Sequence, residues 1–144
     1  MRLTLSSKTK DQLKAVALKQ GKKLKSHATS NISPEQQYPA FSLRYLDKKH
    51  GLTSCNQEQK AALIETIHKL SQLTWNQIYS SSRHASGCEK IARESIKVPI
   101  PKHIPEDVNF LAFRFYGKAP MIGYRDETIF YVLWLDIHFS VYSH

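Results

Sequence analysis

The fold of this chain is decided by residues 109–135, which read NFLAFRFYGKAPMIGYRDETIFYVLWL. Apolar side chains alternate along residues 109–116, so Leu111, Phe113 and Phe115 share one face of a strand. Residues 117–120 (GKAP) and 126–128 (DET) have the composition of tight turns. Residues 129–135 are almost wholly apolar, which is typical of a central strand buried on both faces. The stretch therefore predicts three antiparallel strands, at residues 109–116, 121–125 and 129–135.

Residues 136–144 extend this pattern, because Phe139, Val141 and Tyr142 follow an expected bend at residues 136–138. We therefore expect residues 108–144 to form a compact β-meander of three to four strands. Its surface would be basic and would carry histidine and tyrosine side chains.

Upstream of the meander the pattern changes to a short strand and then to helices. Residues 41–46 alternate apolar and polar, and a helix follows whose cap is Ser54 or Asn56. Thr74 with Gln77 gives a second capping signal, so the helix should bend or restart near residues 71–74. Residues 89–95 are expected to add one helical turn, and the prolines of residues 98–105 predict an extended connector. The fold class is α+β.

The charge of the chain is concentrated at its N-terminal end. The 144 residues carry a formal charge of +9, and residues 1–25 hold eight lysines and arginines against Asp11, which is +7. A polar stretch follows. We therefore divide the chain into a basic N-terminal helical arm with a linker (residues 1–37) and a single α+β domain (residues 38–144). The charge favours a polyanionic partner such as RNA or the ribosome.

Several classes of protein are disfavoured. The chain has no apolar run of the roughly 18 residues that a membrane span needs. It has no secretory signal, and its two cysteines lack the CxxC spacing, so we expect a cytoplasmic protein with reduced thiols. Glycine-rich phosphate loops and HExxH motifs are absent, so no cofactor is expected.

Two arginines of the meander are candidate phosphate ligands. Arg114 and Arg125 lie on successive predicted strands, where an antiparallel pair could bring them together on one face. Two guanidinium groups there would each offer phosphate a rigid fork of donors. The alternative is that each arginine pairs with Glu127, Asp136 or Asp107 on the sheet surface. The other candidate RNA-binding residues are the lysines Lys118, Lys22, Lys23 and Lys25.

The candidate catalytic residues are His138, Tyr142 and His144. RNA cleavage through the 2′-hydroxyl needs a base, an acid and cations that stabilise the transition state, and histidine, tyrosine and arginine would supply this set. The alternative is that His138 is a turn residue and His144 a solvated terminus. A metal site built from both histidines and Asp136 has no recognisable spacing, so no metal is expected.

The C-terminal pattern resembles the RelE/ParE toxin superfamily of small bacterial proteins. The resemblance covers roughly residues 41–144, and the stretches that carry it are FRFYGK (113–118), IGYR (122–125), FYVLWLDIH (130–138) and Tyr142. It implies a strand, one or two helices and an antiparallel sheet, with cleavage of mRNA in the ribosomal A site by the ribonuclease members. It also implies phosphate binding by Arg114 and Arg125, and proton transfer by His138 or His144 with Tyr142.

Two hypotheses therefore remain open. The first is a toxin-like, metal-independent endoribonuclease of a toxin–antitoxin module, whose antitoxin covers the sheet. The second is a non-catalytic nucleic-acid- or protein-binding protein of a mobile element, because the ending of the chain is also similar to that of small mobile-element proteins of no implied activity.

Overall fold

The chain divides into two units, residues 1–32 and 33–144, and a computed structural model describes residues 31–82 and 87–143. The predicted helical arm and its lysines Lys22, Lys23 and Lys25 lie outside the described residues. Residues 33–37, which the sequence placed in the linker, belong to the second unit. The backbone N–H of Trp75 donates to the carbonyl of Gln37 at 3.1 Å, which ties this segment to the domain.

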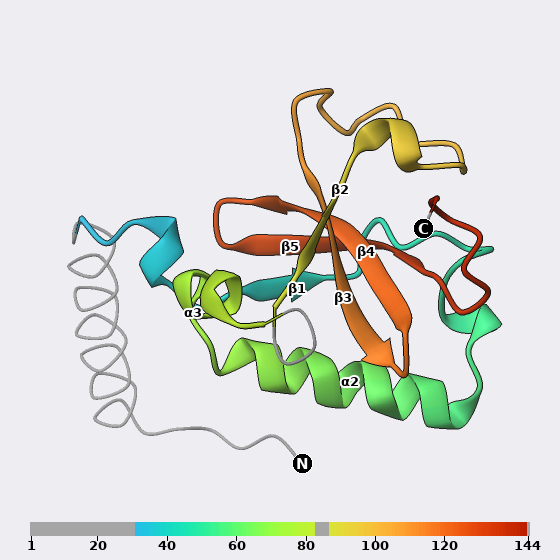
Figure 1. The fold of residues 1–144 in the computed structure, drawn as a ribbon, viewed down its shortest axis with the longest axis horizontal. Helices are drawn as coiled ribbons and strands as arrows, with labels where there is room; N and C mark the ends of the chain where they lie inside the picture. Colours follow the sequence, from blue (N-terminus) through green and yellow to red (C-terminus); the bar gives the residue numbers. More distant parts are fainter. Residues whose placement is uncertain (1–30, 83–86, 144) are drawn as a thin grey trace, which may run out of the picture. The chain divides into compact units, whose positions relative to one another are not determined.

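The second unit is built on a five-stranded sheet of order β1-β5-β4-β3-β2 (Figure 1). Strands β3 (Phe110–Tyr116), β4 (Ala119–Asp126) and β5 (Ile129–Leu135) pair antiparallel in sequence order. This confirms the predicted meander and the α+β class. Both turns lie within the expected stretches but have only two residues each, because Tyr116 pairs with Ala119 and Asp126 with Ile129. Strand β4 is therefore longer than the predicted residues 121–125.

The sheet has two short edge strands, one at each side. Strand β2 (Glu89–Ile91) pairs antiparallel with β3, so the helical turn expected from residue 89 is wrong there; a 3₁₀ turn, η3 (Arg93–Ser95), follows it. Strand β1 (Ala40–Ser42) pairs parallel with β5 and is shorter than the predicted residues 41–46. Each edge strand forms by pairing with a strand that is distant from it in the sequence.

Two helices follow β1, with the interruption that the sequence predicts. Helix α2 (Gln57–Ser71) begins at a capping box of Asn56 and Gln59, and α3 (Trp75–Ser80) begins at one of Thr74 and Gln77. In each box the cap side chain accepts from a backbone N–H while the glutamine accepts from the backbone N–H of the cap residue. Short 3₁₀ turns, η1 (Pro34–Gln36) and η2 (Leu52–Ser54), complete this half of the domain.

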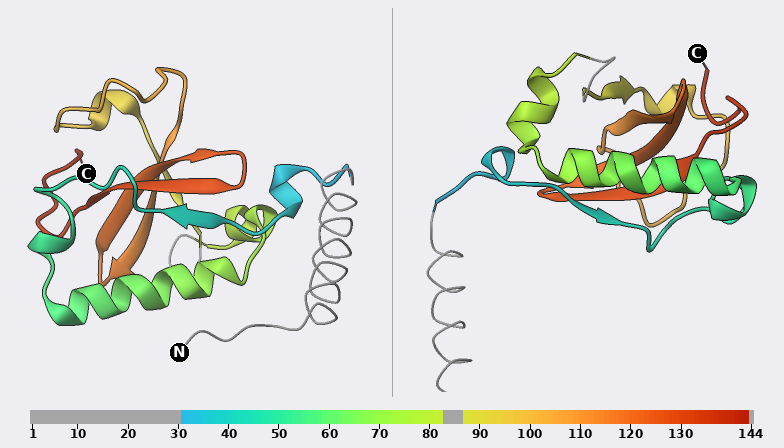
Figure 2. Two further views of the ribbon diagram at one scale, coloured as in Figure 1. Left: turned by 180° about the vertical axis from the view of Figure 1, so that it is seen from behind. Right: turned by 90° about the horizontal axis from the view of Figure 1, so that it is seen from below.

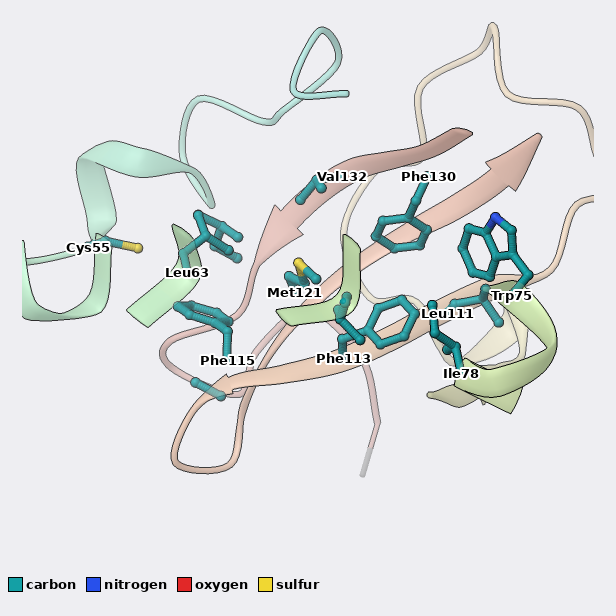
Figure 3. Packing of buried hydrophobic residues seen from close by; sticks show 13 residues of the cluster. Cys55, Leu63, Trp75, Ile78, Leu111, Phe113, Phe115, Met121, Phe130 and Val132 are labelled. Carbon is teal, nitrogen blue, oxygen red and sulfur yellow. The ribbon is translucent and has the colours of Figure 1, made fainter. Parts of the chain in front are cut away.

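A hydrophobic core lies on each face of the sheet. The first fills the space between the helices and the sheet, where Leu63 of α2 and Trp75 and Ile78 of α3 pack against the strands (Figures 2 and 3). The second lies under the connector of residues 96–108 and includes Trp134. Both tryptophans are buried, at 0% and 1% exposure, as expected of core residues. The sheet is thus covered on both faces.

The segment after β5 forms a loop and not a fourth strand of the meander. Its only ladder contact among the described residues is one bridge between Tyr142 and Ile96. Asp136 is 1% exposed, and its carboxylate accepts from the backbone N–H of Ser140 at 2.8 Å and of Val141 at 3.2 Å. This carboxylate therefore folds the loop back onto the sheet.

Within the described ranges, no helix combines the length and apolar character required to cross a membrane.

Candidate functional site

Arg114 and Arg125 lie on opposite faces of the sheet. Arg114 follows Ala112, which belongs to the core under the connector, whereas Arg125 follows Met121 and Gly123 on the face of the helices. They also lie at opposite ends of the β3–β4 pair, because Arg114 is opposite Pro120 and Arg125 lies beyond the Phe110–Tyr124 pair. The expectation that the two share a face is wrong. The register that follows from the two-residue loop at residues 117–118 separates them.

Arg125 is held by protein groups. Its Nε donates to the carbonyl of Glu127 at 2.5 Å, its Nη1 to the hydroxyl of Tyr79 at 3.1 Å and its Nη2 to the carboxylate of Glu35 at 3.1 Å. The guanidinium also lies 4.5 Å from the centre of the Trp75 ring. Arg125 therefore joins η1, α3 and the β4–β5 turn, and this accounts for its position without a ligand.

A first cavity, about 680 Å³, adjoins Arg125. Its charged lining residues are Glu35, Asp107, Glu127, Lys90 and Arg125, so carboxylates outnumber cations, and Arg125 is already paired. This balance disfavours a polyanion there.

The second cavity, about 300 Å³, brings together three of the predicted site residues: Arg114, Lys118 and Tyr142. Glu89 and Phe139 also line it. Two cations face one carboxylate, so the ionisable lining has a net positive charge. It lies on the sheet face opposite the helices, and we take it as the candidate site.

The polar side chains of this cavity come from different parts of the fold. Arg114 comes from β3 and is half-buried, and Lys118 lies in the β3–β4 loop, where Gly117 adopts φ 57°. That conformation is easy for glycine and strained for other residues. Glu89 is paired with Ala112, which places it on the face of Arg114. Tyr142 is 5% exposed and is held at its bridge to Ile96.

The other predicted site residues lie outside this cavity. His138 is exposed on the loop after β5 and is not part of the lining, and His144 lies outside the described residues. The carboxylate of Asp136 accepts the two backbone hydrogen bonds of the loop after β5. No group of three His, Cys, Asp or Glu residues within residues 31–82 and 87–143 could hold a metal ion.

Sequence reasoning missed Glu89 and Phe139. Glu89 lay in a segment expected to be helical, and its position opposite Ala112 depends on the β2–β3 pairing. Phe139 was taken as part of a further strand, whereas it has φ 56°, a conformation unusual for a bulky residue. The place of Glu89 two residues before the apolar Ile91 was a weak signal for the strand that carries Glu89. No local signal pointed to Phe139.

The two cysteines are free thiols with weak nucleophilic character. Burial raises the pKa of the Cys88 thiol, and burial likewise raises that of Cys55. A raised pKa leaves little thiolate at neutral pH. Cys88, although it precedes Glu89, is therefore a poor candidate for a catalytic nucleophile.

No protein-family model matches the chain, and comparisons with curated proteins and with solved structures give no match. The candidate site therefore rests on the geometry above.

Proposed function

We propose that this chain binds RNA through the second cavity, with Arg114 and Lys118 as its phosphate ligands. The observation that carries the proposal is the presence of both cations and Tyr142 in one concave site. A guanidinium can donate two parallel hydrogen bonds to a phosphate, and a lysine supplies a mobile point charge beside it.

The charge distribution of the chain supports the same proposal. Residues 1–25 hold +7 of the +9, which leaves +2 for the other 119 residues together. Cations gathered in one cavity of a nearly neutral domain indicate a localised anion site. The arm, with Lys22, Lys23 and Lys25, would add attraction to the phosphate backbone that is independent of sequence.

The binding proposal is tested with the full chain and a single-stranded RNA oligomer at several salt concentrations. Lys118→Gln should weaken binding and reduce the slope of log K against log salt by about 0.7, the value for one phosphate contact on a single strand. Lys60→Gln, which changes an exposed side chain of α2, is the matched control and should change neither. Equal slopes for the wild type and Lys118→Gln would refute the assignment of Lys118.

A second candidate function, cleavage of the bound strand, is favoured by Glu89 and Tyr142 in the same cavity. Glu89 would take the proton of the 2′-hydroxyl, the 2′-oxygen would bond to phosphorus, and the bond from phosphorus to the 5′-oxygen would break. Tyr142 would protonate the leaving 5′-oxygen and Arg114 would stabilise the charged transition state. The products would be a 2′,3′-cyclic phosphate and a 5′-hydroxyl.

The cleavage proposal corresponds to the toxin-like endoribonuclease of a toxin–antitoxin module, acting on RNA or the ribosome in the cytoplasm. The two free thiols are consistent with a reducing compartment. Expression in a bacterium should arrest growth and produce messages with cyclic phosphate ends, and Glu89→Gln should abolish both effects. Normal growth and intact message with folded protein would reject cleavage and leave the binding function of a mobile-element protein.

A further inference from the structure

Phe139 combines two features that are unusual for a bulky aromatic residue. Its backbone has φ 56°, in the left-handed region that bulky residues rarely adopt, and its side chain is 45% exposed. A glycine would adopt this conformation without strain, and an exposed ring gains little from burial. Strained residues of this kind are concentrated at functional sites.

The loop around Phe139 is firmly anchored. The buried carboxylate of Asp136 accepts from the N–H groups of Ser140 and Val141, and the N–H of Asp136 donates to the carbonyl of Pro120 at 2.9 Å. Val141 is fully buried immediately after the loop. The position of Phe139 is therefore set by contacts on both sides of it and does not depend on burial of its own ring.

The second cavity is lined by Phe139 together with Arg114 and Lys118. Its volume of about 300 Å³ is at the lower end of the usual range for small-molecule sites, roughly 300–1,000 Å³. An aromatic surface beside cations is the combination that binds single-stranded nucleic acid, with the ring against a base and the cations against its phosphate.

We propose that Phe139 is the base-stacking residue of this site, so that the protein selects unpaired nucleotides over duplex. The inference rests on the proposed RNA binding. In a duplex the faces of a base are covered by its neighbours, whereas an unpaired base offers one to Phe139.

The test compares Phe139→Gly with Phe139→Tyr in the full chain, using three RNA probes: a single-stranded oligomer, its duplex, and an oligomer of the same length made of abasic residues. Phe139→Gly should weaken binding of the single strand by about tenfold, in line with the loss of one base–aromatic stack. Binding of the abasic oligomer should not change. Phe139→Tyr, which keeps the ring, should bind like the wild type.

Thermal unfolding separates this role from a structural one. Glycine relieves the strained φ, so Phe139→Gly should melt at the wild-type temperature or above while its RNA binding falls. Wild-type affinity of Phe139→Gly for the single strand would overturn the stacking role, as would an equal loss of affinity for the abasic probe.

Arg114→Gln keeps the two proposals distinguishable. Loss of abasic binding in Arg114→Gln with no effect of Phe139→Gly would retain phosphate binding and reject only the stacking residue. No effect of Arg114→Gln on any probe would reject the proposed RNA site itself, and the stacking role with it.

Discussion

Replacing Arg125 should reveal a structural residue and not an RNA ligand. In Arg125→Met the stem is kept and the guanidinium is lost. The change removes the hydrogen bonds to the Glu127 carbonyl and the Tyr79 hydroxyl, the contact with the Trp75 ring and the ion pair with Glu35. We expect a lower free energy of unfolding and unchanged binding of RNA in the second cavity.

The size of the loss follows from these contacts. The hydrogen bond to Glu127 contributes about 1 kcal/mol, and the guanidinium over the indole ring of Trp75 contributes about 1 kcal/mol. The Glu35 carboxylate is 49% exposed, so solvent limits the ion pair to about 0.5 kcal/mol. Because these interactions and the exposed hydrogen bond to Tyr79 share one side chain, they are not additive, and we expect a loss of about 2 kcal/mol. For a domain of this size that lowers Tm by about 8 °C.

Urea unfolding followed by tryptophan fluorescence measures this change, since Trp75 and Trp134 are both buried in the folded domain. Glu35→Gln is the matched control and should lose about 0.5 kcal/mol, because it removes only the charge of the partner. An Arg125→Met protein with wild-type stability and lost RNA binding would refute the structural role and restore Arg125 as a phosphate ligand.

Three further changes test other parts of the domain. A Cβ at Gly123 would lie 1.9 Å from the Tyr131 carbonyl oxygen, so Gly123→Ala should lose about 3 kcal/mol of unfolding free energy in urea; a loss below ~0.5 kcal/mol would contradict this packing. Asn56→Ala should lower the free energy of unfolding by about 1 kcal/mol, whereas Asn56→Ser, which can still cap α2, should lower it much less. Equal losses in the two variants would argue against the cap. Burial raises the pKa of the Cys88 thiol, so its alkylation by iodoacetamide at pH 7.5 should be slower than that of free cysteine. The alkylation should accelerate as the pH rises through the thiol pKa. A rate equal to that of free cysteine would contradict this prediction.

The central strands were predictable because their signal is local. Alternation along residues 110–116 specifies a strand and the faces of its side chains, and the apolar run of residues 129–135 specifies a buried strand. The capping boxes at Asn56 and Thr74 also depend only on residues close in sequence. The strands β1 and β2 have three residues each, too few for a period to be visible, and their pairing with β5 and β3 is a property of the folded chain.

The candidate site was predictable only in part. Arg114, Lys118 and Tyr142 were selected from their residue types, and the structure brings them to one cavity. The pairing of Arg114 with Arg125 failed because the face of each arginine depends on the register across the β3–β4 loop. Phe139 could not be found because its backbone conformation is imposed by Asp136 and the buried residues around it.

The parallel pairing of β1 with β5 has a consequence for synthesis of the protein on the ribosome. Residues 40–42 leave the exit tunnel long before their partners, residues 129–131, and α2 is likewise complete before the strand β3 against which it packs. The apolar faces of β1, α2 and α3 thus emerge with no sheet to cover them. The nascent domain must remain open, and accessible to chaperones, until β5 has left the exit tunnel.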